Sequence, residues 1–211
     1  FRYYEMPMGR YDLALLGKSW ITTYRTGEQH FHNYYEIGYC YYGEGVVFLG
    51  DKSEPYKAGT ISLIPSNFPH GVHSREGSVC RWEWLYLDFA GFVERSYQSD
   101  VYNGMRILDQ ITQFPIMIES EDYPGLSGVV RAILEENRQQ KMLNREAVCG
   151  YMFVLLQELM RLNQYMSGID KKQSLHIEKI RPALVYIEEH YQEEIKIKSL
   201  AEVCSISEPH F

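Results

Sequence analysis

Closely spaced cysteines are missing from this sequence. The four cysteines are Cys40, Cys80, Cys149 and Cys204. No two of them form the C-x-x-C pair that many zinc and redox sites use, and isolated thiols stay reduced inside cells. We therefore interpret them as buried thiols in a reducing cytosol, and we expect no cysteine-based metal or redox centre.

Long apolar runs and a leader sequence are missing too. No uncharged segment reaches the roughly 18 residues that a membrane-spanning helix needs. The first residues also lack the basic, apolar and small-residue regions of a secretory leader. We predict a cytoplasmic protein with no membrane partner.

The chain also has no surplus of basic residues. Its 21 lysines and arginines stand against 28 aspartates and glutamates, so the net charge is -7. Nonspecific nucleic-acid binding by the whole chain is therefore not expected, although a small DNA-reading module on an acidic body stays open. With 211 residues, 45% of them hydrophobic, the chain can form one medium domain and a small appendage.

Aromatic residues, by contrast, are abundant at 14%, with 18 tyrosines. Their rings suit both the half-buried surface of a β-sheet and the apolar face of a sugar. Residues 1–122 contain short aromatic or β-branched segments separated by turn residues, which predicts a small antiparallel barrel or sandwich. The expected strands are 13–24, 30–42, 45–50, 60–65, 70–74 and 81–90.

Residues 123–168 change to a helical period. Ser127 is the expected cap of a first helix, and Asn144 opens a longer second one. The apolar stripe of the second helix is broad, so one side is assigned to a homodimer interface. The residues of this predicted interface are Val148, Met152, Leu155, Leu159 and Leu162. The alternative is that the whole stripe belongs to the core of a single chain.

Two histidines and a glutamate in HFHNYYEIGYCYYG form the first candidate site. Side chains alternate between the faces of a strand, so His30, His32, Tyr34 and Glu36 are expected on one face. His70, in GTISLIPSNFPH, supplies a further imidazole. Imidazoles and a carboxylate that converge inside a barrel can hold a divalent metal such as Zn, Ni, Fe or Mn.

These two segments resemble the two motifs of the cupin superfamily, H-x-H-x3-E-x6-G ending at Gly43 and G-x5-P-x4-H. Asn67 and Ser74 depart from the pattern, because the family usually has glycine and often asparagine there. The resemblance implies an antiparallel β-barrel, or jelly roll, that brings His30, His32, Glu36 and His70 together. Sensor cupins keep such residues merely to line a polar pocket. A metal site and a metal-free effector pocket therefore both stay open, and no cofactor is required.

The segment RWEWLYLDFA supplies further candidates for an effector pocket. Trp82, Trp84 and Tyr86 share one strand face, where large rings can stack on the apolar face of a sugar. Ordinary core packing is the alternative for these rings. Arg81 and Glu83 point the other way, and we interpret them as solvent or interface groups.

The end of the chain has the pattern of a helix-turn-helix. Residues 169–178 are polar and unpatterned, as in a linker, and residues 179–211 hold short helices. In LAEVCSIS, Ala201 is small where a second helix must cross closely, and Ser207 caps the reading helix. Ser205 stands at the turn position where glycine is common.

A cupin barrel, helices, a linker and this pattern, in this order, resemble AraC/XylS-type transcriptional regulators over essentially the whole chain. The resemblance implies a sensing and dimerisation portion whose barrel binds a small effector, with a sugar as the first expectation. Ser207 and His210 would begin a recognition helix that is cut off at the end of the chain. The chain is therefore expected to be a fragment, and DNA binding is expected only through the full-length C-terminal domain.

Two further hypotheses concern the pocket. Residues 1–12, which carry Tyr3, Tyr4 and Tyr11, are expected to close it. The alternative function is a metal-dependent cupin enzyme, either a dioxygenase or a sugar isomerase. That alternative leaves the helix-turn-helix pattern without an explanation, so we predict that the protein is not an enzyme.

Overall fold

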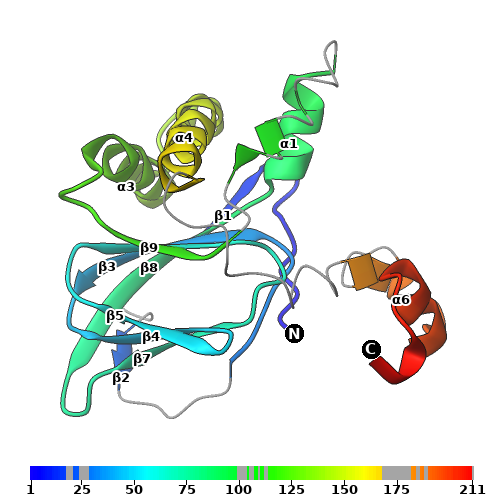
Figure 1. The fold of residues 1–211 in the computed structure, drawn as a ribbon. Helices are drawn as coiled ribbons and strands as arrows, with labels where there is room; N and C mark the ends of the chain where they lie inside the picture. Colours follow the sequence, from blue (N-terminus) through cyan, green and yellow to red (C-terminus); the bar gives the residue numbers. More distant parts are fainter. Residues whose placement is uncertain are drawn as a thin grey trace. The chain divides into compact units, whose positions relative to one another are not determined.

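A computed structural model of the chain describes residues 1–17, 21–23, 29–98, 104, 107–108, 110–111, 114–167, 182–183, 186–187 and 190–210, without the side chains of 21–23, 167 and 210. The chain divides into two compact units, Phe1–Gly168 and Ile169–Phe211. The first unit contains the sheets and the helices that pack on them, and the second contains short helices (Figure 1).

Two antiparallel sheets that face each other form the body of the first unit (Figure 1). The larger sheet has the order β1-β8-β3-β6-β9, with β2 also paired to β8, and the smaller has the order β5-β4-β7. The strands are β1 Asp12–Leu15, β2 Ile21–Thr23, β3 Tyr35–Tyr42, β4 Gly45–Leu49, β5 Lys52–Tyr56, β6 Thr60–Ile64, β7 His70–Ser74, β8 Val79–Leu87 and β9 Ile116–Glu119. The prediction of a mainly β protein with α, built on an antiparallel cupin-type barrel, is confirmed.

The larger sheet has an inner and an outer face, because side chains along each strand alternate. On β8, Trp82, Trp84 and Tyr86 belong to a small core between the two sheets. Leu85 and Leu87 of the same strand belong instead to a larger core outside the barrel. The one strand therefore contributes both to the core inside the barrel and to the core beneath the helices.

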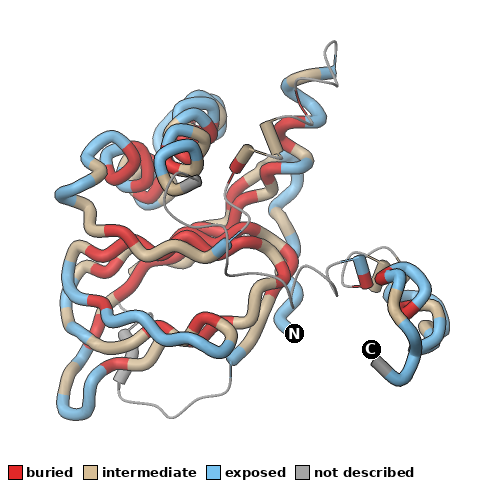
Figure 2. Tube along the Cα trace, viewed as in Figure 1, coloured by how far each residue is buried: buried red, intermediate tan, exposed pale blue. Residues whose placement is uncertain are grey.

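Helices α3, Pro124–Gln139, and α4, Asn144–Ser167, cover the outer face (Figure 1). Pro124 suits the first turn of α3, since the amide that proline lacks would have no partner inside the helix. The predicted start of the second helix at Asn144 is confirmed. Figure 2 shows that both helices bury the side turned toward the sheet, which is how the larger core forms.

Several predicted element bounds need correction. The sequence predicts a strand over 81–90, but β8 ends at Leu87 and helix α1, Phe89–Ser96, follows. The Asp88 carboxylate caps α1, because its Oδ1 accepts a hydrogen bond of 2.9 Å from the Gly91 amide. The predicted cap Ser127 lies instead in the first turn of α3. Strands β5 and β9 are additional, and the strand predicted from residue 30 begins only at Tyr35.

The residues predicted for the homodimer interface lie in the core of the chain itself. Their relative exposures are 1% for Val148, 0% for Met152, Leu155 and Leu159, and 3% for Leu162. The stripe packs on α3 and on the sheet, because a helix that covers a sheet buries its most apolar side. In this arrangement these five side chains are not available to a second copy. Exposed apolar side chains on α4 include Phe153, Val154 and Tyr165.

The second unit contains α6, Ile197–Val203, and the 3-10 helix η2, Glu208–His210. Ala201 is buried in α6, and the Ile206 amide donates a hydrogen bond of 3.0 Å to the Ala201 carbonyl. Ser205 has a φ of 54°, the left-handed conformation that favours glycine. The predicted linker 169–178 lies outside the described residues, as does the side chain of His210. In the part of the chain that is described, no helix is long and apolar enough to cross a bilayer.

Candidate functional site inside the barrel

Three chain segments bring the histidines and the glutamate together. Glu36 lies on β3 and His70 begins β7, whereas His30 and His32 precede β3. His30 and His70 form an isolated antiparallel bridge with two backbone hydrogen bonds of 2.8 Å. The residues predicted as one strand face thus converge through a bridge between segments rather than through a continuous strand.

The turn before His70 is held at Asn67. Its backbone N–H donates a hydrogen bond of 2.7 Å to the His32 carbonyl, which ties the two motif segments together. Asn67 has a φ of 59°. This left-handed conformation explains why glycine is usual at the position, and asparagine is among the few other residues that adopt it readily. The departure from the cupin pattern therefore leaves the local fold intact.

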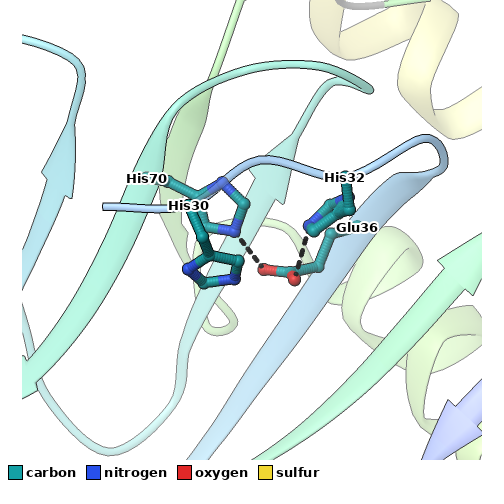
Figure 3. Close-up of side chains that lie close together, drawn as sticks. All are labelled: His30, His32, Glu36 and His70. Atoms are coloured by element: carbon teal, nitrogen blue, oxygen red, sulfur yellow. Dashed lines mark hydrogen bonds and ion pairs between the residues drawn. The ribbon is translucent and has the colours of Figure 1, made fainter. Parts of the chain in front are cut away.

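The four side chains form one compact cluster (Figure 3). One ligand atom from each of His30, His32, Glu36 and His70 lies within 4.8 Å of the others. His32 Nε2 lies 2.9 Å from Glu36 Oε2, and His70 Nε2 lies 3.4 Å from Glu36 Oε1. His32, Glu36 and His70 are buried, and His30 is partly exposed. The predicted cluster is thus assembled around a single carboxylate.

Backbone carbonyls orient two of the imidazoles. His32 Nδ1 lies 2.9 Å from the Tyr34 oxygen, and His70 Nδ1 lies 2.8 Å from the Phe68 oxygen. A carbonyl can only accept, so Nδ1 carries the proton in both rings. In the neutral rings both Nε2 lone pairs then point at the Glu36 carboxylate, which is also an acceptor. A cation, either an added proton or a metal ion, is needed to reconcile these groups.

The charges in the cluster follow from burial and from these contacts. Burial alone would raise the pKa of Glu36, but His70 and the hydrogen bonds from His32 and His70 outweigh it, and the pKa lies well below its usual range. Burial would lower the pKa of His70, yet the Glu36 charge raises it overall. Burial lowers the pKa of His30 to about 3, and His70 adds to the shift. The environment therefore favours the ionised form of Glu36 and the neutral form of His30.

The donor set fits a divalent metal. Imidazole Nε2 atoms fixed by Nδ1–H bonds to carbonyls, together with one carboxylate, are the arrangement that metal sites commonly use. The same set can also hold a polar ligand without a metal. The geometry therefore supports both of the uses that the sequence leaves open.

The other predicted effector-binding residues are Tyr34, Trp82 and Trp84, which are not among the four side chains of the cluster. Tyr34 orients His32 through its carbonyl, and its side chain packs against the small core. Trp82 and Trp84 stack with ring centroids 4.9 Å apart and an interplanar angle of 8°. Trp82 is fully buried and Trp84 is 8% exposed, so packing accounts for most of their ring surface.

The N-terminal segment contacts the cluster through Tyr4. The Tyr4 ring stacks on the Tyr86 ring with centroids 4.1 Å apart, and it meets the His32 ring edge-on with centroids 5.9 Å apart. The Tyr86 hydroxyl also donates a hydrogen bond of 3.1 Å to the Tyr4 hydroxyl. Sequence reasoning did not identify Asn33, whose side chain bonds both the Tyr4 amide, at 3.0 Å, and the Tyr4 carbonyl, at 3.1 Å. Of the other tyrosines in the segment, Tyr3 is 54% exposed and Tyr11 packs on Phe92.

Comparison with known proteins agrees with this architecture. The family model of the AraC-like ligand binding domain matches residues 13–144. An uncharacterized HTH-type transcriptional regulator, YfiF of Bacillus subtilis (strain 168), is 22% identical over 187 residues, which cover 86% of this chain and 57% of that protein. The chain thus spans little more than half of this relative.

Solved structures give the same fold. ToxT from Vibrio cholerae superposes with a TM-score of 0.56 at 9% identity, covering 94% of this chain and 72% of ToxT. A structure of apo ToxT from strain SCE256 gives 0.54 at 11% identity, covering 93% and 71%. At these identities the likeness shows the fold alone. The family points to a transcriptional regulator rather than an enzyme, and the match over most of the barrel and the α3 region shows that this chain belongs to the family of AraC-like ligand binding domains.

Proposed function

We propose that this chain is the effector-sensing and dimerisation portion of a cytoplasmic transcriptional regulator. Its barrel binds a small effector, a sugar or a related polar metabolite, and binding controls how the regulator engages DNA. The observation that carries the proposal is the buried cluster of His32, Glu36 and His70, whose His32 ring contacts Tyr4. Buried ionisable groups are costly for a fold to keep, and they are typical of ligand sites.

The N-terminal segment offers a route from the pocket to the helices. Six residues after Tyr4, the Arg10 guanidinium donates to Asn144 Oδ1 at 2.7 Å and to Asn137 Oδ1 at 3.2 Å. These asparagines lie at the start of α4 and the end of α3. An effector that displaces or tightens Tyr4 would favour one placement of this segment, and it can shift the protein only by its difference in affinity for the two placements.

The homodimer is proposed to use the exposed side of α4. Phe153, Val154 and Tyr165 are 40%, 48% and 65% exposed, and such apolar side chains suit a helix pair. The DNA contacts are proposed to come from the complete C-terminal domain, of which Ser207 and His210 begin the first reading helix. Both proposals concern the whole regulator, of which this chain is the sensing part.

Thermal-shift measurements test the sensing function. Neutral sugars, sugar acids and other polar metabolites are added to the purified chain, and a true effector raises the melting temperature in proportion to the logarithm of its concentration. We expect Glu36→Gln to lose this response and Glu54→Gln, an exposed change on β5, to keep it. If no compound of any of these classes raises the melting temperature, the proposal is wrong.

A divalent metal is a second candidate occupant, favoured by the two Nε2 lone pairs that face Glu36. In that case His30, His32, Glu36 and His70 would hold the ion, which would present open positions to the effector. Elemental analysis of protein purified without a histidine tag should find about one ion per chain after dialysis. His70→Ala should lose the ion and His73→Ala, a change outside the cluster, should retain it. Metal that leaves the wild-type protein on dialysis would exclude this candidate.

A further inference from the structure

Helix α1 contacts three other parts of the first unit, and it lies beside β1 (Figure 1). The Phe89 ring meets the Tyr35 ring of β3 with centroids 5.3 Å apart. The backbone N–H of Asp88, the cap of the helix, donates a hydrogen bond of 2.9 Å to the Tyr11 carbonyl at the end of the N-terminal segment. Phe92, on the next turn, contacts α4. The helix is therefore a junction between the barrel, the N-terminal segment and α4.

The Phe92 ring makes two aromatic contacts at this junction. It meets the Tyr11 ring edge-on with centroids 5.4 Å apart, and it meets the Phe153 ring of α4 edge-on with centroids 4.8 Å apart. Phe92 is 2% exposed, so its ring has little room to move. Edge-to-face pairs at these separations are favourable beyond the area that they bury. One buried ring thus connects the N-terminal segment to α4.

Phe153 lies on the side of α4 that is proposed to meet a second copy of the chain. Its side chain is 40% exposed, and it contacts Phe92 and Tyr97 within its own chain, with the Tyr97 centroid 6.4 Å away. An exposed side chain that is already held in place loses less entropy when an interface forms than a freely rotating one does. The contact with Phe92 therefore prepares the Phe153 ring for a partner.

We propose that Phe92 is a positioning residue for the dimer. Its ring holds Phe153 in the conformation that meets the second copy. Because the same ring contacts Tyr11, the dimer surface also depends on where the N-terminal segment lies. This inference rests on the proposed dimer and deepens it, since it assigns control of the contact to a helix that lies outside it.

Sedimentation equilibrium of leucine variants tests the role of Phe92. Leucine keeps the core apolar but removes the flat ring. Phe92→Leu frees the Phe153 ring in both copies of a symmetric dimer, so the dimer dissociation constant should rise about fivefold. Phe89→Leu removes a ring of the same helix that is also buried and contacts Tyr35 of β3. This matched control should keep the wild-type constant at temperatures where both variants are folded.

A double-variant cycle separates positioning from a general loss of packing. Phe153→Leu should weaken the dimer by itself, and Phe92→Leu should add nothing to that loss, because the ring that it positions is gone. Tyr11→Leu should raise the dissociation constant about twofold, and this rise should disappear when Phe92 is already leucine. The three variants together follow the path from the N-terminal segment to the dimer surface.

The outcomes distinguish failure of this inference from failure of the dimer. A wild-type constant for Phe92→Leu, an equal rise for Phe89→Leu, or additive losses with Phe153→Leu would each overturn the positioning role while the dimer stands. A wild-type constant for Tyr11→Leu would overturn the link to the N-terminal segment. A wild-type chain that is monomeric at every concentration would contradict both the dimer and the inference, and effector binding would still be judged by the thermal-shift measurements.

Discussion

The two faces of the larger sheet bury polar groups in opposite ways. On the outer face, the carboxylates of Asp12 and Glu83 are almost fully buried, and each pairs with an arginine, Asp12 with Arg10 of its own segment and Glu83 with Arg138 of α3. On the inner face, the buried Glu36 carboxylate pairs with the His32 and His70 imidazoles, which are charged only when protonated. The outer carboxylates thus pair with permanently charged arginines, whereas the partners of the inner carboxylate need an added proton before they are charged.

Asp12 shows how the outer face is satisfied. It accepts hydrogen bonds from Arg10 Nε at 2.9 Å, from Arg10 Nη2 at 3.0 Å and from Asn137 Nδ2 at 2.6 Å. Arg10 also bonds Asn144, so the end of α3, the start of α4 and β1 are joined in one network. A network in which every member is paired makes the placement of these elements specific.

Glu83 likewise joins β8 to the C-terminal end of α3. Sequence reasoning interpreted it as a solvent or interface group, but its side chain is 0% exposed. It pairs with Arg138 of α3, with Arg81 at 3.0 Å and with the Gly17 amide at 3.1 Å. The strand alternation that places Glu83 opposite the tryptophans was correctly predicted. Its burial depends on α3, which the local pattern of β8 cannot reveal.

The apolar part of the outer face should give the largest effect on stability. Leu155→Ala removes a fully buried side chain from the core between α4 and the sheet, and we expect the free energy of unfolding to fall by about 3 kcal/mol. Val154→Ala, next to it but 48% exposed, should cost less than about 0.5 kcal/mol. Chemical denaturation measures both.

Sedimentation of the same two variants sharpens the comparison. The exposed side of α4 is proposed to pair with a second copy. Val154→Ala, on that side, should therefore weaken the dimer, whereas Leu155→Ala, on the buried side, should leave the dimer dissociation constant unchanged. If the chain is a monomer in wild type, or if Leu155→Ala weakens the dimer at temperatures where it is folded, the assignment of the exposed side is wrong.

Removal of the paired Asp12 carboxylate should give the second-largest loss of stability. Asp12→Ala leaves Arg10 and Asn137 without their acceptor, and we expect a loss of about 2 kcal/mol in the free energy of unfolding. The value is below that of a fully buried pair, because Arg10 is 18% exposed. Asp51→Ala, at an exposed turn, is the control and should be neutral. A loss no larger than that of the control would mean that the network does not hold the helices to β1.

The smallest effect is expected at Glu83, and it depends on pH. Burial would raise the pKa of Glu83, but hydrogen bonds from Tyr41, the Gly17 amide and Arg138 outweigh it, and the pKa lies below the ordinary 4.5. The folded state therefore binds fewer protons than the unfolded state, and the stability from Glu83 is present above pH 4.5 and lost as the pH falls through the folded pKa. Glu83→Gln should cost about 1 kcal/mol at pH 7, since Arg138 is partly exposed.

Unfolding curves at several pH values check this prediction. The difference between wild type and Glu83→Gln should stay constant from pH 7 to about 5 and shrink below 4.5. Glu76→Gln, at an exposed turn, should follow the wild-type curve at every pH. A difference that grows on acidification would show that the carboxylate is not stabilised by its partners.

Motif spacing was the most informative part of the sequence. The two histidines, Glu36 and His70 identify the cluster because the chemistry needs these residue types at this separation, and the helical stripe after Asn144 marks α4. Asn33 has no such signal. Its importance arises from its hydrogen bonds with the Tyr4 backbone, which depend on two segments that are far apart in the sequence. The five residues predicted for the dimer are buried in the single chain, and the stripe could not reveal this because an apolar stripe looks the same whether it faces a sheet or a second helix.

The sequence by itself determined the class of the fold and the residues of the histidine cluster. Strand alternation and motif spacing are local properties that require no knowledge of the packing. Only the tertiary structure decided which buried groups are satisfied, because hydrogen bonds at Glu83, Asp12 and the cluster come from other elements. The distinction between structural and functional polar groups in this protein is therefore a property of how its segments meet.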